Sequence, residues 1–239
     1  MKILRMIFSW LFLLVFFSAC GLDTFYYLDP PISRHFIDDA SSLSNDPSNQ
    51  FVSFITASSN ADNADIFQGS SVYYKIYNSP DQLFNNKKSI ENINKEYTNQ
   101  GMELLISWGY QPLTTDKVDT VNLVAAGGSQ EVTIRLWNQT LDGEGNYKYP
   151  ARIQVGGNDI GIPVRSVNDN FFSFNSSVDG DSPYSLPMEG QEDVTFTAGA
   201  GTSTWYVALY AVSTGMSPSL TPVYSQVVYL GSLAIVPSN

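Results

Sequence analysis

Short apolar stretches separated by turn residues recur along most of the chain, and one of them alternates regularly. From Gln130 to Trp137, the apolar residues Val132, Ile134 and Leu136 occupy every second position, and polar residues lie between them. Successive side chains of a strand point to opposite faces of a sheet. This period of two therefore predicts a strand with one buried face.

Other segments have a composition typical of strands, because they are short and rich in β-branched and aromatic residues. These segments are 51–55, 71–77, 119–125, 149–155, 160–167, 171–174, 193–198, 204–212 and 223–236. The turn signals at 156–159 and 168–170 separate neighbouring segments. Many short strands at turn-length spacing indicate an antiparallel β-sandwich or barrel.

The segment from Ser79 to Trp108 follows a helical pattern instead. Ser89 suits an N-cap, and Gly109 suits a C-terminal stop. Apolar residues follow at helical spacing, namely Ile90, Ile93, Tyr97, Leu104 and Leu105. We expect a helical insertion near 79–109, either one helix of about eighteen residues or two shorter ones.

The beginning of the chain has the layout of a secretory signal. Lys2 and Arg5 precede the apolar run from Met6 to Phe17. That run is twelve residues long, whereas a membrane-spanning helix needs about twenty. Small residues and then Cys20, the only cysteine of the chain, follow it. We expect residues 1–19 to be a cleaved signal peptide.

The motif Phe17-Ser18-Ala19-Cys20 resembles the lipobox of bacterial lipoproteins. Leu is commonest where Phe17 stands, and spirochaete-like lipoboxes have bulky residues there. The resemblance implies a type II signal peptide, a diacylglycerol on the Cys20 thiol and a further acyl chain such as palmitate on its amine. It also implies a protein anchored to a membrane of the cell envelope. Gly21 favours the outer membrane, and the choice between periplasmic and surface face stays open.

The alternative is an ordinary cleaved signal that leaves Cys20 as a free thiol. An unpaired exposed thiol is a liability in an oxidising compartment, which favours the lipoprotein interpretation. Residues 20–50 are then the lipidated N-terminus with a tether or first strand. Residues 51–239 form the folded domain.

The charge balance narrows the classes of partner. The chain has 23 acidic and 12 basic residues and a formal net charge of −11. Nucleic-acid binding needs clustered Lys and Arg, so we expect no nucleic-acid partner. The acidic balance also opposes an electrostatic attraction to anionic lipid.

Three segments resemble strands of fibronectin type III domains. Val52-Ser53-Phe54 resembles the second strand of that fold, Tyr74-Lys75-Ile76-Tyr77 the third, and 205–212 the strand near the end. The resemblance implies a mainly β fold, an antiparallel immunoglobulin or fibronectin III-like sandwich. Trp205 stands where the family has its corner tyrosine, so the hydroxyl of that corner is missing.

The middle of the chain is too long for a normal domain of that family. Residues 79 to about 165 exceed what a sandwich of about 100 residues accommodates between these strands. We expect a large insertion containing one or two helices. The alternative is that 118–175 forms a separate small β unit.

No set of residues predicts catalysis. His35 is the only histidine, and no Gly-x-Ser-x-Gly motif accompanies it. One histidine and one acylated cysteine cannot build a zinc site of nitrogen and sulfur ligands. We predict no catalytic residues and no cofactor.

One acidic loop has a weak resemblance to a calcium site. Asp142, Glu144 and Asn146 place oxygen atoms at alternate positions, and Asp179-Gly180-Asp181 is similar but shorter. Clusters of this kind between strands are more often plain turns. We expect a turn, with calcium as the alternative at the first loop.

Tyrosines predict a candidate binding surface. Side chains alternate between the two faces of a strand, and we expect this of Tyr73, Tyr77, Tyr206 and Tyr210. If one set faces outward on neighbouring strands, it forms an aromatic platform for a glycan or a protein. The favoured alternative is that these tyrosines line the two faces of the sandwich, with their hydroxyls at the rim.

These observations favour a membrane-anchored lipoprotein that acts as a non-enzymatic binding or adhesion module, with an unidentified protein or glycan ligand. One alternative is a structural component of the envelope. A less favoured alternative is a polysaccharide hydrolase that uses two carboxylates.

Overall fold

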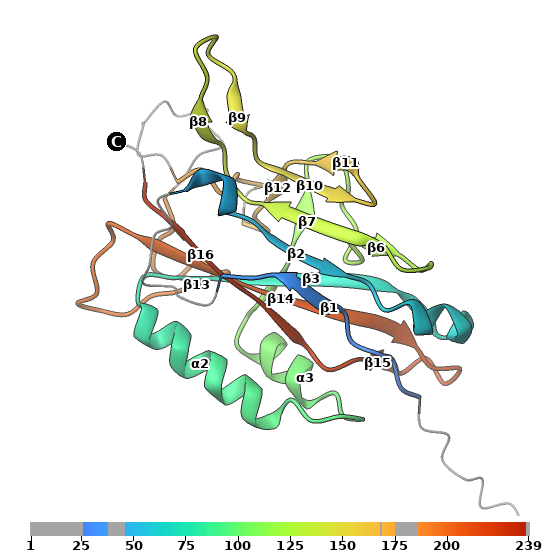
Figure 1. Ribbon diagram of the computed structural model, residues 1–239. Coiled ribbons are helices and arrows are strands. Elements are labelled where there is room, and N and C mark those ends of the chain that lie inside the picture. Colours follow the sequence, from blue (N-terminus) through green and yellow to red (C-terminus); the bar gives the residue numbers. More distant parts are fainter. Residues whose placement is uncertain (1–25, 38–45, 168, 175–185, 238–239) are drawn as a thin grey trace, which may run out of the picture.

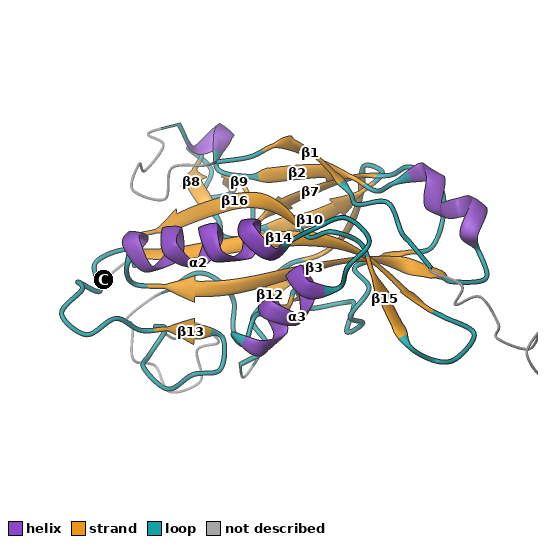
Figure 2. Ribbon diagram, turned by 90° about the horizontal axis from the view of Figure 1, so that it is seen from below, coloured by secondary structure: helices purple, strands orange, loops and turns teal. Residues whose placement is uncertain are grey.

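The protein is a mainly β sandwich of two sheets, with two helices on the outer face of the larger sheet (Figures 1 and 2). The computed structural model describes residues 26–37, 46–167, 169–174 and 186–237. The predicted signal peptide, Cys20 and the 179–181 loop lie outside the described residues. The predicted β-sandwich with a helical insertion is confirmed.

The smaller layer is a five-stranded antiparallel sheet. Its strands, in spatial order, are β1 (Ile32–His35), β2 (Val52–Ile55), β7 (Glu131–Arg135), β10 (Arg152–Val155) and β11 (Asn158–Gly161). The pairing of β2 with β7 places the middle of 118–175 in the same sheet as the N-terminal part of the domain. The alternative of a separate β unit at 118–175 is therefore wrong.

The larger layer is built on two long antiparallel strands, β3 (Phe67–Tyr77) and β14 (Trp205–Met216). Strand β16 (Val228–Ile235) pairs along the other side of β14. Shorter strands complete the sheet, namely β4 (Gln111–Pro112), β6 (Val124–Ala125), β13 (Val194–Thr195) and β15 (Pro222–Tyr224). The pairing of β13 with β3 is parallel, and the other strand pairs of this sheet are antiparallel.

The segments that resemble fibronectin type III strands all form strands. The first is β2 in the small sheet, and the other two belong to β3 and β14, which are neighbours in the large sheet. The N-terminal segment also links the two sheets, because β1 pairs with β2 whereas Ile37 bridges to Gly231 on β16. A Cβ at Gly231 would lie 2.7 Å from backbone atoms of Ile37, so only glycine permits this close approach.

Two smaller ribbons and two short 3₁₀ helices lie at the periphery. The ribbons pair β5 (Thr114–Thr115) with β12 (Pro163–Val164), and β8 (Gln139–Leu141) with β9 (Tyr147–Tyr149). The 3₁₀ helices are Pro47–Asn49 and Ser58–Asn63. Figure 1 shows the β8–β9 hairpin projecting from the body of the sandwich.

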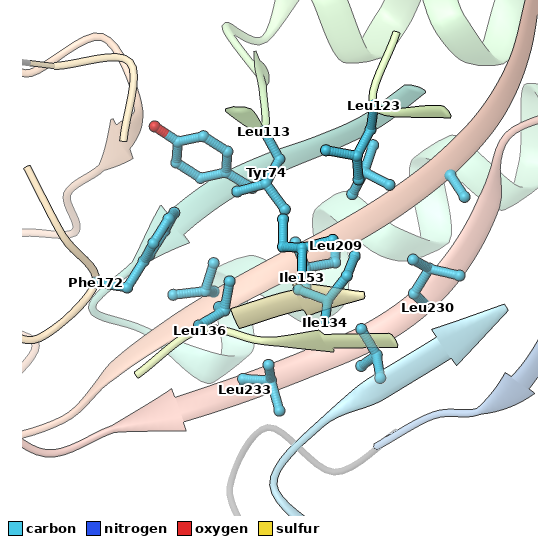
Figure 3. Close-up of a cluster of buried hydrophobic side chains, with 14 of the residues drawn as sticks. Tyr74, Leu113, Leu123, Ile134, Leu136, Ile153, Phe172, Leu209, Leu230 and Leu233 are labelled. Carbon is cyan, nitrogen blue, oxygen red and sulfur yellow. The ribbon is translucent and has the colours of Figure 1, made fainter. Parts of the chain in front are cut away.

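The main core lies between the sheets, and strand alternation builds it. Val132, Ile134 and Leu136 are buried in it, which confirms the predicted strand with one buried face. From the large sheet, alternate residues such as Tyr74 and Leu209 point into the same core (Figure 3). Burial of these side chains away from water supplies most of the stability of a domain without disulfides.

The insertion forms two helices, α2 (Pro80–Ile93) and α3 (Gln100–Ser107). The predicted N-cap is wrong: Ser79 caps α2 by accepting a hydrogen bond from the Gln82 amide, with Pro80 as the first helical residue. Ser89 lies inside the helix, where its hydroxyl donates to the Asn85 carbonyl. Proline at the first helical position is favoured, and this signal outweighs the serine further along.

Residues just after each helix hold the insertion in place and end it. The Asn94 side chain accepts from the Val227 amide and donates to the Val227 carbonyl, which joins the end of α2 to the large sheet. Gly109 follows α3 with φ +70°, as predicted for a C-terminal stop.

Several predicted strands differ from the structure. Segments 119–125 and 193–198 contribute only the two-residue β6 and β13, and 171–174 forms a single bridge between Phe171 and Val164. Segments 160–167 and 223–236 are each divided between two strands. Phe172 and Phe174 are nevertheless buried in the main core. Apolar composition indicates that a segment is buried, but an irregular segment can be buried too. Composition without an alternation of apolar and polar residues therefore does not identify a strand at these positions.

Candidate functional site

The four predicted tyrosines do lie on one face of the large sheet. Tyr206 is directly opposite Tyr77, and Tyr210 is directly opposite Tyr73, across the β3–β14 pair. The two helices cover this face, and Tyr73, Tyr77 and Tyr210 are buried beneath them whereas Tyr206 is partly buried. The expectation of an exposed aromatic platform is therefore wrong for these three residues, because the helical insertion docks on their rings.

Hydrogen bonds and ring contacts close this tyrosine layer. The hydroxyls of Tyr77 and Tyr110 are 2.9 Å apart, and the Asn86 amide donates to Tyr77. The ring of Tyr110 meets that of Tyr210 edge-on, with 5.5 Å between centroids. Burial raises the pKa of Tyr110 and Tyr210 well above the ordinary value for tyrosine, so both stay protonated at neutral pH. The layer therefore holds the helices to the sheet and offers no acid or base.

A second polar cluster is buried around Arg165. Its guanidinium makes two hydrogen bonds of 2.8 Å to the two carboxylate oxygens of Asp193 and one of 2.7 Å to Gln191. The Tyr74 hydroxyl donates to the same carboxylate at 2.9 Å. Burial, followed by the charge of Asp193, raises the pKa of Tyr74. The cluster ties β3 to the segments before and after residues 175–185, and its side chains are enclosed.

Lys75 belongs to the same region and holds the insertion in place. Its ammonium group donates to the carbonyls of Gly109 and Glu192 at 3.1 and 2.7 Å. Burial lowers the pKa of Lys75, and the carboxylates of Asp193 and Glu192 partly offset that effect. These contacts fix the end of α3 against the segment that leads into β13.

The acidic loop at 142–146 forms the turn of the β8–β9 hairpin. The Asp142 carboxylate accepts hydrogen bonds from the amides of Glu144 and Asn146, at 2.9 and 2.8 Å. These bonds, with that from Asn146 first, lower the pKa of Asp142. Among the described residues, no group of three or more His, Cys, Asp or Glu side chains could hold a metal ion. The geometry is that of a side chain closing its own turn, so nothing favours calcium here.

His35 lies on edge strand β1 and packs within the domain. Its ring stacks on Phe51 with 4.2 Å between centroids, and its Nε2 lies 3.3 Å from the Asn49 carbonyl oxygen. Arg135 approaches the same Phe51 ring and donates to the carbonyls of Pro47, Ser48 and Gln50. The histidine thus contributes to anchoring the 47–50 segment.

An open cavity of about 640 Å³ lies where β14 begins and β16 ends. It is lined mainly by apolar side chains from segments that are distant in sequence, with a few polar residues. The lining residues are Leu186, Pro187, Met188, Glu189, Phe196, Thr202, Ser203, Trp205, Val236 and Pro237. Ligand sites are typically concave and mostly apolar, with a small number of polar groups, and of this size. We call this group of residues the Trp205 cavity.

Trp205 lines the cavity and belongs to the main core. It is 1% exposed, and its buried indole Nε1 has no hydrogen-bond partner among the described residues. A buried donor without a partner is uncommon in native proteins and calls for an explanation. The side-chain hydrogen bond expected at a fibronectin III corner is therefore absent, and the indole does not replace it.

The sequence did not identify this cavity. In the sequence, Trp205 stands out only because it occupies the position of the corner tyrosine in the strand that resembles a fibronectin type III strand. The other lining residues lie in loops or at strand ends. The available signal was weak: Met188 and Val236 are apolar residues next to turn-forming residues, and such residues are common on surfaces.

Comparison with known proteins found no match among protein-family models, curated proteins or solved structures. Within the described ranges, no helix has the length and apolar character needed to cross a membrane.

Proposed function

We propose that this protein is a lipid-anchored component of a bacterial envelope whose sandwich is a non-enzymatic binding module. The observation that carries the binding role is the Trp205 cavity, which is open, mainly apolar and of ligand size. The anchor is supported by the sequence alone, through the lipobox resemblance ending at Cys20.

The position of the cavity suits a binding role on an anchored protein. Near the start of the described chain, Leu28 packs with Phe67 and Val223, and its side chain approaches Gly215 at the far end of β14. Trp205, at the start of β14, is ten residues from Gly215, which corresponds to about 33 Å along an extended strand. Figure 1 shows these two ends of the sandwich on opposite sides of the molecule. An anchor at Cys20 would leave the cavity facing away from the membrane.

The cavity's lining supports binding better than hydrolysis. Glycoside hydrolysis uses a pair of carboxylates on either side of the scissile bond. Among the described residues that line the cavity, Glu189 is the one acid and no histidine accompanies it. The hydrolase alternative therefore has no support from this site.

Metabolic labelling with a fatty acid tests the anchor, in cells that express the wild-type chain or Cys20→Ala. We expect label in the wild type and none in the variant. Protease treatment of intact cells then distinguishes a surface location, where the domain is digested, from a periplasmic one, where it is protected. Wild-type protein without label would overturn the anchor.

A variant that fills the cavity distinguishes a binding role from a purely structural role in the envelope. Val236→Trp places a large ring at an exposed position of the lining. If the protein acts by binding, a strain with this variant should behave like a deletion strain. If the protein only supports the envelope, the variant should behave like the wild type.

A further inference from the structure

We propose that the end of the sandwich where the described chain begins contacts the bilayer directly, with Tyr97 and Leu220 inserted into the surface of a membrane of neutral lipid. The inference rests on the proposed lipid anchor at Cys20 and goes beyond it. The anchor holds the domain at a membrane, whereas this second contact fixes which end of the domain faces the lipid.

Three segments of the chain meet at this end, and we call them together the tether junction. They are residues 26–29, 94–99 and 217–224. Each segment contacts the other two, and Figures 1 and 2 both show the described chain beginning beside β15. The contacts are the rings of Tyr27 and Tyr97, with 4.6 Å between centroids, the packing of Leu28 with Val223, and a hydrogen bond of 3.2 Å from the Tyr224 amide to the Asn99 side chain.

The tether junction leaves two large apolar side chains in water. Tyr97 is 69% exposed, and Leu220, at 80%, is the most exposed large apolar side chain of the described residues. Single exposed apolar residues are common, but several at one place are typical of a surface that another body covers.

The backbone at these two positions also requires an explanation. Tyr97 and Leu220 have φ values of +62° and +60°, in the left-handed region. Glycine and asparagine adopt this region far more readily than bulky residues do. Since neither side chain is buried, stability of the fold explains neither choice. Residues held in such conformations are concentrated at functional sites.

The tether supplies the reason to identify the covering body as the membrane. Tyr27 is the seventh residue after Cys20, so the two lie at most about 25 Å apart. An acyl chain on Cys20 therefore holds the tether junction near the bilayer, where even a weak contact forms because it is intramolecular. Tyrosine is enriched at the membrane–water interface, and leucine is suited to the boundary with the acyl chains.

The charges at the tether junction favour neutral lipid. Burial, followed by the charges of Asp29 and Glu96, raises the pKa of Tyr27, so both carboxylates face the aromatic pair. Lys95 is the one basic residue in the three segments. Anionic headgroups would be repelled by this balance, whereas zwitterionic lipid such as phosphatidylcholine would not.

A nitroxide label beside Leu220 tests the contact. Cys20 is the only native cysteine, and acylation blocks its thiol, so Thr221→Cys provides one reactive site on an exposed residue. The full lipidated protein is placed in phosphatidylcholine vesicles. Electron paramagnetic resonance then measures collisions of the label with oxygen, which concentrates in the bilayer, and with a water-soluble nickel chelate. We expect more oxygen collisions and fewer nickel collisions than at Leu141→Cys, a 58% exposed position on the β8–β9 hairpin.

Three further substitutions in the Thr221→Cys chain control the experiment. Leu220→Ser and Tyr97→Ser each remove one inserted side chain, and each should raise the nickel collisions of the label towards the value in the hairpin. Phe84→Ser removes a 52% exposed side chain on α2, outside the tether junction, and should leave the collisions unchanged. All three positions are exposed, so the domain should keep its fold, which circular dichroism checks.

Three results would overturn the inference. Equal nickel collisions at 221 and 141 would place the turn in water. Fewer nickel collisions without additional oxygen collisions would show that protein, either a second copy or a partner, covers the turn. Deeper immersion after addition of phosphatidylglycerol would contradict the preference for neutral lipid.

Mass spectrometry of the same sample separates this inference from the proposed anchor. An acylated Cys20 together with a turn that stays in water would refute the second contact and leave the anchor intact. A Cys20 without acyl chains would refute the anchor and, with it, the contact that depends on it.

Discussion

The tyrosine layer and the Trp205 cavity both contain aromatic residues, yet the first is closed and the second is open. Under the helices, the hydroxyls of Tyr77 and Tyr110 pair with each other. The Tyr210 ring is buried between the rings of Tyr110 and Tyr229. The cavity, by contrast, is open, and Met188 and Val236 in its lining are exposed. Aromatic content alone therefore does not mark a site. Exposed apolar side chains around an opening are the better signal.

The largest expected effect is a fall in the free energy of unfolding at alkaline pH, caused by the buried tyrosine layer. Burial raises the pKa of Tyr73 from 10.0 to about 12, and burial also raises the pKa of Tyr77, Tyr110 and Tyr210. In the unfolded chain these phenols lose their protons near pH 10, whereas the folded chain keeps them. The unfolded state then binds fewer protons, so the free energy of unfolding falls as pH rises above about 10.

We expect the absorbance of tyrosinate to appear together with the loss of circular dichroism, because the buried phenols ionise only on unfolding. Full tyrosine ionisation in a chain that is still folded would contradict a closed layer.

The next largest effect is expected for Asp193→Ala. This change removes the carboxylate that pairs with the buried Arg165 and accepts from Tyr74. Loss of one partner of a buried ion pair costs about 3–5 kcal/mol of the free energy of unfolding. Urea unfolding measures it, with Asp142→Ala in the exposed hairpin as the control that should cost far less. Equal losses for the two variants would show that the Arg165 cluster does not hold the domain together.

A smaller effect is expected for Tyr110→Phe, which keeps the ring and removes the hydroxyl paired with Tyr77. One hydrogen bond contributes about 1 kcal/mol to the free energy of unfolding. Urea unfolding of the variant measures the loss. A stability equal to that of the wild type would mean that the hydroxyl pair does not close the layer, and would weaken the contrast with the cavity.

The smallest effect on stability is expected for Val236→Trp. The side chain is half exposed at the cavity, and surface substitutions of this kind usually change the free energy of unfolding by about 0.5 kcal/mol or less. The variant should thus lose ligand binding and keep its stability, whereas Tyr110→Phe should do the reverse. A large loss of stability at Val236 would show that the cavity is part of the core.

The sequence predicted a strand correctly where apolar residues alternate with polar ones and are also buried in the structure. At 130–137 the alternation and the burial agree, and the strand is present. At 171–174 the apolar residues are buried without a strand, because Phe172 and Phe174 enter the core from an irregular segment. The insertion near 79–109 was correctly placed by its helical spacing, although Pro80 and not Ser89 marks its beginning.

The sequence by itself determined most of the short strands and the helical insertion, because these depend on periodicity and on residues that are near one another in the chain. Only the tertiary structure decided that the four tyrosines share one face and that helices cover it, that β7, β10 and β11 belong to the same sheet as β2, and that an open cavity lies beside Trp205. The first two depend on contacts between segments more than a hundred residues apart or on opposite sides of the insertion. The cavity depends on loops and strand ends between residues 186 and 237. A local pattern states which side chains need burial but not which partner provides it.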